Sequence, residues 1–186
     1  MVALIGEASP RVEDRKFLTG AGKYLDDLEF PHISHAVFIR SPHAHARILS
    51  ISTIIAKEMP GVLDIITADD VELSKLNALK PFVQENPNTG EAFSFVEQPL
   101  LARNVVRYQG EPIVLVVAET VAQALDASEV VEIEYSPLPH VVDGKEAARP
   151  GSIKLNSQLD DNIAVKWNTG NSQEIENVFN SADNVV

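Results

Sequence analysis

Short apolar-rich runs, separated by turn-forming residues, recur between residues 35 and 67 in a pattern that is typical of β-strands. Residues 36–40 form one short apolar-rich run, and residues 46–51 form a second run after a Ser-Pro turn signal. A third run, residues 62–67, follows one turn of predicted helix and a Pro-Gly dipeptide. This part of the chain is therefore predicted to consist of short strands with short connections.

The clearest pattern follows in the second half of the chain. Residues 112–118 are continuously apolar after the initial proline, which is typical of a strand covered on both faces of a sheet. Thr120 and Gln123 match a capping box and predict that a helix follows. Residues 131–135 then alternate as in a half-exposed strand. The order strand, helix, strand predicts a βαβ unit with a right-handed crossover. The predicted fold class is α+β, a β-rich mixture of helices and strands.

The other segments are predicted from their turn-forming residues. Residues 1–30 mix charges and glycines without a sustained period, which indicates an extended lead-in. Residues 69–80 are weakly helical, and residues 81–99 contain three prolines and are predicted to be a loop. Residues 144–170 are predicted to be a linker, and a further helix is expected from Asn171. The apolar face of that helix is expected to comprise Ile175, Val178, Phe179 and Ala182.

Composition excludes several classes of function. The 186 residues carry a formal net charge of −12 without a clustered basic stripe, which argues against binding to a phosphate backbone. The longest apolar run, residues 113–118, is far shorter than the roughly 20 residues that a membrane helix needs. The N-terminus lacks a secretory signal pattern, so a cytoplasmic location is the default expectation. With no cysteine, the chain supplies no thiolate ligand or nucleophile.

Only weak signals for chemistry are present. His43 and His45 are two residues apart and would share one face of a strand, so a metal pair is one hypothesis and exposure to solvent or another domain is the other. Adjacent acids point in different directions, and none forms a ready acid/base pair. These doublets are Glu13-Asp14, Asp26-Asp27, Asp69-Asp70 and Asp160-Asp161.

Glycine-containing segments give no complete motif either. Residues 20–22, Gly-Ala-Gly, are only a fragment of a dinucleotide-binding loop. Gly110-Glu111-Pro112 precedes a predicted strand, whereas a phosphate-binding loop follows a strand. The residues by themselves therefore predict no catalytic, cofactor-binding or metal-binding residue. A complete small enzyme that uses its carboxylates is a further hypothesis, but it lacks a supporting constellation.

Several ordered segments together resemble one family. They are residues 11–14 (Arg-Val-Glu-Asp), residues 17–27, residues 40–48 (Arg-Ser-Pro-His-Ala-His-Ala-Arg-Ile), Pro60-Gly61-Val62, residues 67–70, residues 110–112, residues 116–118, residues 135–139 and Asp143. In this order and spacing the chain is similar to the N-terminal part of the large, molybdenum-cofactor-binding subunit of xanthine dehydrogenase, aldehyde oxidase and carbon monoxide dehydrogenase.

This resemblance implies an organisation. It implies an extended lead-in over residues 1–18, an a/b hammerhead domain over residues 19–143, and a linker with the start of the first cofactor-binding domain over residues 144–186. The parent enzymes hydroxylate a carbon centre, or oxidise carbon monoxide, with water as the oxygen source. Their electrons pass from a molybdopterin-type cofactor through iron–sulfur clusters, usually to FAD, on partner domains or subunits.

The same resemblance limits what this segment does alone. The family's glycine-glycine-glutamine and Pro-Met-Glu segments and its catalytic glutamate have no counterpart in these residues, so the chain is expected to be an inactive fragment of a larger oxidoreductase. Its implied role is to pack against the cofactor-binding domains and help wall the substrate channel. Arg40, His43 and His45 are the polar candidates for that contact, with solvent exposure as the alternative. A stand-alone hammerhead interaction module without redox activity is the competing hypothesis.

Overall fold

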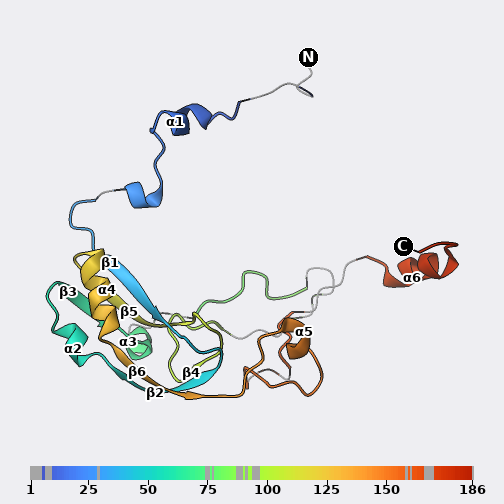
Figure 1. The fold of residues 1–186 in the computed structure, drawn as a ribbon. Coiled ribbons are helices and arrows are strands. Elements are labelled where there is room, and N and C mark those ends of the chain that lie inside the picture. Colours follow the sequence, from blue (N-terminus) through green and yellow to red (C-terminus); the bar gives the residue numbers. More distant parts are fainter. Residues whose placement is uncertain are drawn as a thin grey trace. The chain divides into compact units, whose positions relative to one another are not determined.

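The computed structural model describes residues 6, 10–28, 30–73, 76, 78–86, 90, 92–93, 97–157, 159, 161–165 and 170–185 (Figure 1). The chain forms two compact units, residues 1–34 and residues 35–186.

The described residues of the first unit include two short helical segments. Helix α1 spans Asp14–Leu18, and a 3-10 turn spans Leu25–Asp27. The Asp14 carboxylate accepts the backbone N–H of Arg11, and the Asp27 carboxylate accepts that of Tyr24, at 3.1 and 2.9 Å. The expectation of an extended lead-in is thus wrong at these two places. Each segment is too short to produce a hydrophobic period. The Asp14 carboxylate closes the turn that leads into α1, and the Asp27 carboxylate closes the 3-10 turn itself.

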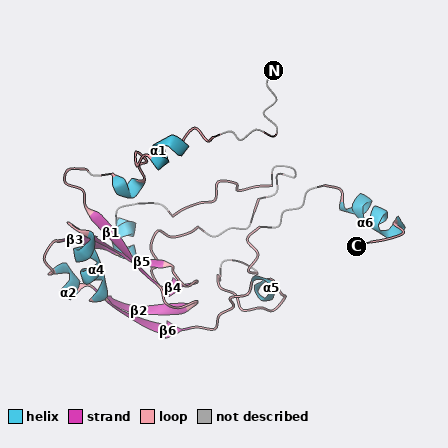
Figure 2. Cartoon of the chain, turned by 45° about the horizontal axis from the view of Figure 1, so that its top comes forward, coloured by secondary structure: helices cyan, strands magenta, loops and turns pink. Residues whose placement is uncertain are grey.

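Where the structure describes the second unit, it contains two three-stranded antiparallel sheets (Figure 2). Sheet A has the order β1 (His35–Arg40), β5 (Pro112–Ala118), β3 (Val62–Ile66). Sheet B has the order β4 (Val105–Val106), β2 (Ala46–Ser52), β6 (Glu132–Pro137). The predicted strands in these regions are confirmed, and β5 is central in its sheet, as its apolar sequence indicates.

Helix α4 (Val121–Glu129) packs on sheet A. It begins as predicted, because the Thr120 hydroxyl accepts the backbone N–H of Gln123 at 3.2 Å. Ala124 and Ala127 are its buried residues, whereas Val121 and Leu125 are about half exposed. The two alanines let the helix approach the strands closely, so the larger side chains lie at the margins of the contact.

The predicted βαβ unit is wrong in its pairing. Strand, helix and strand follow one another as expected, but β5 belongs to sheet A and β6 belongs to sheet B. Strand β5 pairs antiparallel with β1 and β3, and β6 pairs antiparallel with β2. Hydrophobic periodicity predicts that a strand exists, whereas its hydrogen-bonding partner depends on segments that are distant in sequence.

Four further helices complete the described part of this unit. They are α2 (Ile54–Lys57), α3 (Ala68–Leu73), α5 (Gly144–Ala147) and α6 (Ser172–Ser181). Helix α5 lies in the predicted linker, where Asp143 caps it by accepting the N–H of Glu146 at 2.8 Å. Helix α6 starts after Asn171 as predicted, but Ala182 is its C-cap, and its apolar side chains are exposed. The helix expected over residues 69–80 is wrong in its second half: α3 ends at Leu73, residues 76 and 78–80 are not helical, and Leu79 forms a bridge with Gln98.

The predicted loop over residues 81–99 contains little regular structure in its described part. Two isolated antiparallel bridges join Leu79 to Gln98 and Glu85 to Ala92. Residues 87–89, 91 and 94–96 lie outside the described residues.

One hydrophobic cluster joins the two sheets and α4. Its fully or almost fully buried members are Ala46, Ala56, Ile65, Ala102, Val106, Ile113, Val114, Val116, Ala118, Ala124 and Ala127. The residues of both sheets therefore share a single core.

Candidate functional site

Two sequence motifs that are about 70 residues apart meet at one end of sheet A. The N–H of Ser41 donates to the carbonyl of Glu111 at 2.9 Å, and the N–H of Gly110 donates to the carbonyl of Ser41 at 2.8 Å. The Arg40 guanidinium also donates to the Gly110 carbonyl at 2.9 Å. The Arg-Ser-Pro-His-Ala-His and Gly-Glu-Pro segments thus form one hydrogen-bonded junction, which sequence spacing alone does not reveal.

The Glu111 side chain anchors this junction from inside. It is only 4% exposed, and its carboxylate accepts the backbone N–H of Arg107 at 2.5 Å. Burial raises the pKa of the Glu111 carboxyl, while the backbone N–H groups of Arg107 and Tyr108 and the Arg107 charge act in the opposite direction. Gly110 has φ +92°, so the chain turns here in a conformation that favours glycine. Glu111 therefore holds the turn over residues 107–111 together.

The two histidines do not share a strand face. His43 and His45 lie in the connection between β1 and β2, so the expected placement on one strand is wrong. The His43 ring packs edge-on against the Tyr135 ring, with centroids 4.8 Å apart. His45 Nδ1 lies 2.6 Å from the Pro139 carbonyl oxygen. Strand β1 ends at Arg40, before Ser41-Pro42, and both imidazoles contact the segment that contains and follows β6.

A metal centre finds no support in this region. Across the part of the chain that the structure describes, no group of three or more histidine, aspartate or glutamate side chains is placed to hold a metal ion. None of the helices in the described part of the chain has the length and the apolar sequence to span a bilayer.

The acidic doublets have local structural roles in their described members. Besides Asp14 and Asp27, the Asp70 carboxylate accepts the N–H and the hydroxyl of Thr67, at 2.8 and 2.7 Å. The Asp161 carboxylate accepts the N–H of Ile163 at 2.9 Å. Asp160 lies outside the described residues. In each doublet the second acid thus closes a turn of the backbone, which is a common use of aspartate.

Asp70 gives a prediction about acid stability. Hydrogen bonds from the backbone and side chain of Thr67 lower the pKa of Asp70 below its ordinary value of 3.8. A lowered pKa stabilises the folded state above pH 3.8, and this contribution is lost as the pH falls through the folded-state pKa. We expect Asp70→Asn to unfold at lower urea concentration than the wild type at pH 7, with a smaller difference at pH 3. The exposed Asp126→Asn is the control, and an unchanged difference across this range would contradict the prediction.

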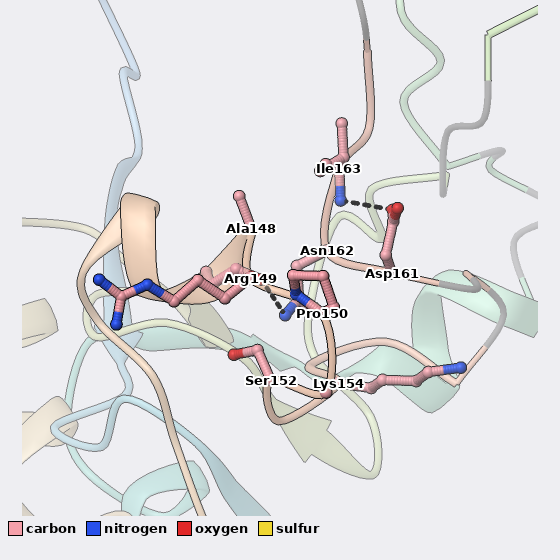
Figure 3. Close-up of a pocket in the computed structure, with 10 residues that line it drawn as sticks. Ala148, Arg149, Pro150, Ser152, Lys154, Asp161, Asn162 and Ile163 are labelled. Carbon is pink, nitrogen blue, oxygen red and sulfur yellow. Dashed lines mark hydrogen bonds between the residues drawn. The ribbon is translucent and has the colours of Figure 1, made fainter.

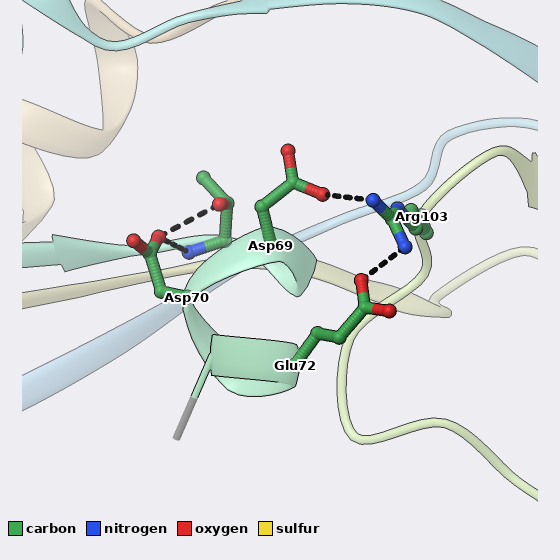
Figure 4. A network of polar contacts seen from close by, with 5 residues as sticks. Asp69, Asp70, Glu72 and Arg103 are labelled. Atoms are coloured by element: carbon green, nitrogen blue, oxygen red, sulfur yellow. Dashed lines mark hydrogen bonds and ion pairs between the residues drawn. The ribbon is translucent and has the colours of Figure 1, made fainter. Parts of the chain in front are cut away.

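An exposed ion-pair cluster lies at α3 (Figure 4). The Arg103 guanidinium lies between Asp69 and Glu72; its Nη2 is 2.9 Å from the Asp69 carboxylate, and its Nη1 donates to Glu72. The cluster ties α3 to the segment before β4. All three side chains are more than half exposed, so this contact contributes only about 0–1 kcal/mol. A cavity of about 430 Å³ beside it is lined by residues 48–51 of β2 together with Asp69 and Arg103.

A second cavity, of about 390 Å³, lies in the loop after α5 (Figure 3). The Asn162 amide organises this loop, since it accepts the N–H of Leu155 at 3.0 Å and donates to the carbonyl of Ile153 at 2.8 Å. Arg149 and Lys154 line the cavity, but their side chains point in opposite directions, and Arg149 pairs with Glu146 at 2.7 Å. The polar groups do not converge as those of a catalytic or anion-binding site do.

Comparison with known proteins identifies the chain. The sequence pattern of the family described as aldehyde oxidase and xanthine dehydrogenase, a/b hammerhead domain, matches residues 19–139. The chain belongs to this family. The resemblance drawn from the residues is thereby confirmed, and so is the mixed α and β fold class of the hammerhead domain.

The relatives of this chain are much longer proteins. The chain is 39% identical over 183 residues to the nicotine 6-hydroxylase large subunit of Paenarthrobacter nicotinovorans, a match that covers 98% of this chain and 21% of the relative. It is 33% identical to the carbon monoxide dehydrogenase large chain of Afipia carboxidovorans, covering 93% and 22%. The chain therefore spans about a fifth of the length of these relatives.

Solved structures share the hammerhead fold. Quinoline 2-oxidoreductase from Pseudomonas putida 86 superposes with a TM-score of 0.74 at 37% identity, covering 86% of this chain and 20% of that one. The Cu,Mo-containing carbon monoxide dehydrogenase superposes with a TM-score of 0.75 at 32% identity, covering 96% and 22%. The chain thus corresponds to the hammerhead domain of the large subunits of such oxidoreductases.

Proposed function

We propose that this chain is the hammerhead segment of the large subunit of a molybdenum hydroxylase. Such an enzyme hydroxylates a carbon centre, or oxidises carbon monoxide, with water as the oxygen source. The observation that carries the proposal is the 39% identity over 98% of the chain to one fifth of the nicotine 6-hydroxylase large subunit. The role of the segment itself is structural: it packs against the molybdenum-cofactor-binding domains of the same polypeptide and helps wall the substrate channel.

The described residues do not fit the family's cofactors. They place no three histidine, aspartate or glutamate side chains together, and the sequence contains no cysteine for an iron–sulfur cluster. Two cationic side chains line the cavity after α5, but they point apart. In a site for a pterin phosphate, the cationic side chains would converge on the phosphate. We therefore assign the molybdenum cofactor to other domains of the subunit, and the iron–sulfur clusters and flavin to partner domains or subunits.

Domain organisation and location follow as parts of the proposal. Residues 1–18 would lead into the hammerhead domain over residues 19–143, and residues 144–186 would connect it to the first cofactor-binding domain. The exposed apolar side chains of α6, Ile175, Val178 and Phe179, support the last assignment because a helix with such a face is normally packed against a neighbour. A cytoplasmic location stays a prediction.

The test is to purify the native protein from its source cells and measure polypeptide length and metal content together. We expect peptides of residues 35–140 to come from a polypeptide about five times as long as this chain, since the match covers 21% of the relative. That polypeptide should co-purify with molybdenum and reduce an electron-accepting dye with a nitrogen heterocycle, an aldehyde, a purine or carbon monoxide. A free polypeptide of 186 residues without molybdenum would contradict the proposal and favour the stand-alone interaction module.

A further inference from the structure

Sheet A is apolar on both faces, but α4 covers only one of them. Strand register places Val37, Val116 and Ile65 in one row across the three strands. These residues belong to or pack against the buried cluster that contains Ala124 and Ala127 of α4. This face of the sheet is therefore closed.

The opposite face carries a second set of apolar side chains. Phe38, Leu115 and Ile66 form one row across the strands, and Ala36 and Val117 lie in the next row. We call these five residues the open face of sheet A. Phe38 is 45% exposed and Ala36 is exposed, while the other three are only partly buried. A central strand as apolar as β5 is normally covered on both sides, so this face lacks its cover among the described residues of the second unit.

One charge of each sign flanks the open face. Arg40 lies on β1, two residues after Phe38, and its guanidinium carbon is 5.2 Å from the centre of the Phe38 ring. Asp64 of β3 lies opposite Val117, in the same row as Ala36 and Val117. Both side chains are exposed, and the guanidinium has more donors than its bond to the Gly110 carbonyl uses. A matching surface would place a carboxylate near Arg40 and a basic side chain near Asp64.

We propose that the rest of the large subunit packs on the open face of sheet A, an inference that rests on the proposed function. Its contacting surface is a layer of apolar side chains with a carboxylate facing Arg40 and a basic group facing Asp64. The relatives are about five times as long as the matched region, so they contain enough further chain to supply this cover. A second copy of this chain is disfavoured as the occupant, because each copy carries a formal charge of −12.

Hydroxyl-radical footprinting tests the proposal on two samples, the intact native subunit and the 186-residue chain. The oxidation rate of Phe38 should be about tenfold lower in the intact subunit, because interface cores are shielded from solvent. Ile55 on α2, 63% exposed in this chain, is the matched probe outside the open face, and its rate should change less. Equal oxidation of Phe38 in both samples would overturn the proposal.

A pair of variants adds a test in solution. Phe38→Glu should lower the thermal midpoint of the intact subunit more than Ile55→Glu does, while both variants leave the midpoint of the 186-residue chain almost unchanged. Equal shifts in the intact subunit would overturn the assignment to the open face.

Sedimentation of the 186-residue chain as a dimer with protected Phe38 would also overturn this assignment, in favour of a second copy. Native protein without the longer polypeptide refutes the proposed function, whereas a molybdenum-containing subunit with exposed Phe38 refutes this inference alone.

Discussion

Truncation of Ile65 to alanine should lower the free energy of unfolding by about 3 kcal/mol, because it opens a cavity where sheet A meets α4. Ile65 is 1% exposed and lies opposite Val116, which is fully buried in the central strand. Several of the surrounding core residues are alanines, and a methyl side chain cannot rotate to fill the cavity that the substitution leaves. Equilibrium urea unfolding of the 186-residue chain, followed by circular dichroism, measures the change.

A matched control lies on the same strand. Leu63 is 53% exposed at the irregular pairing between Val62 and Asp64, so Leu63→Ala should cost less than about 1 kcal/mol. The comparison separates loss of core packing from any general intolerance of β3 to alanine. Similar losses for Ile65→Ala and Leu63→Ala would show that the buried cluster is not where the structure places it.

The second large effect is expected at Glu111. Its replacement by alanine leaves the backbone N–H of Arg107 without its carboxylate acceptor in a half-buried turn. Hydrogen bonds to charged groups contribute about 1.5–3 kcal/mol, and removal of the buried charge offsets part of that loss. We therefore expect Glu111→Ala to lower the free energy of unfolding by about 2 kcal/mol. The urea midpoint at pH 7 tests this value, with Glu129→Ala on the exposed surface of α4 as the control.

The pH dependence at Glu111 has the opposite sign to that at Asp70. Because burial raises the pKa of Glu111, its contribution to stability is fully present below the unfolded-state value near 4.5 and decreases as the pH rises through the folded-state pKa. Glu111→Gln removes this titration but keeps an oxygen acceptor. We expect the stability of the wild type relative to Glu111→Gln to fall as the pH rises through that interval. If the stability of the wild type relative to Glu111→Gln rises with pH instead, Glu111 is not a buried carboxyl with a raised pKa.

Much of the candidate site was visible in the sequence, but its roles were not. Residues 40–45 and 110–112 both stood out as motifs, yet nothing in their spacing predicts that Ser41 bonds to Gly110 and Glu111. His43 and His45 suggested a shared face because two residues that are two positions apart on a strand point the same way, but both follow the Ser41-Pro42 turn signal and lie in the connection between β1 and β2. Glu111 was missed as a buried carboxyl; the available signal was its position immediately before an apolar strand. Asp70 and its counterparts were visible as acids, whereas their use as turn-closing acceptors depends on backbone geometry.

The sequence by itself determined strands β1, β2, β3, β5 and β6, the capped starts of α4 and α6, and the family, because these depend on local periodicity, capping residues and ordered motifs. Strand β4, with only two residues, is too short to produce a period. Only the tertiary structure decided that β5 and β6 belong to different sheets, since strand pairing joins segments whose separation carries no periodic signal. It also decided which face of sheet A is covered. An apolar strand is equally compatible with α4 on either side, and only the packing of Ala124 and Ala127 leaves Phe38 on the face that remains open.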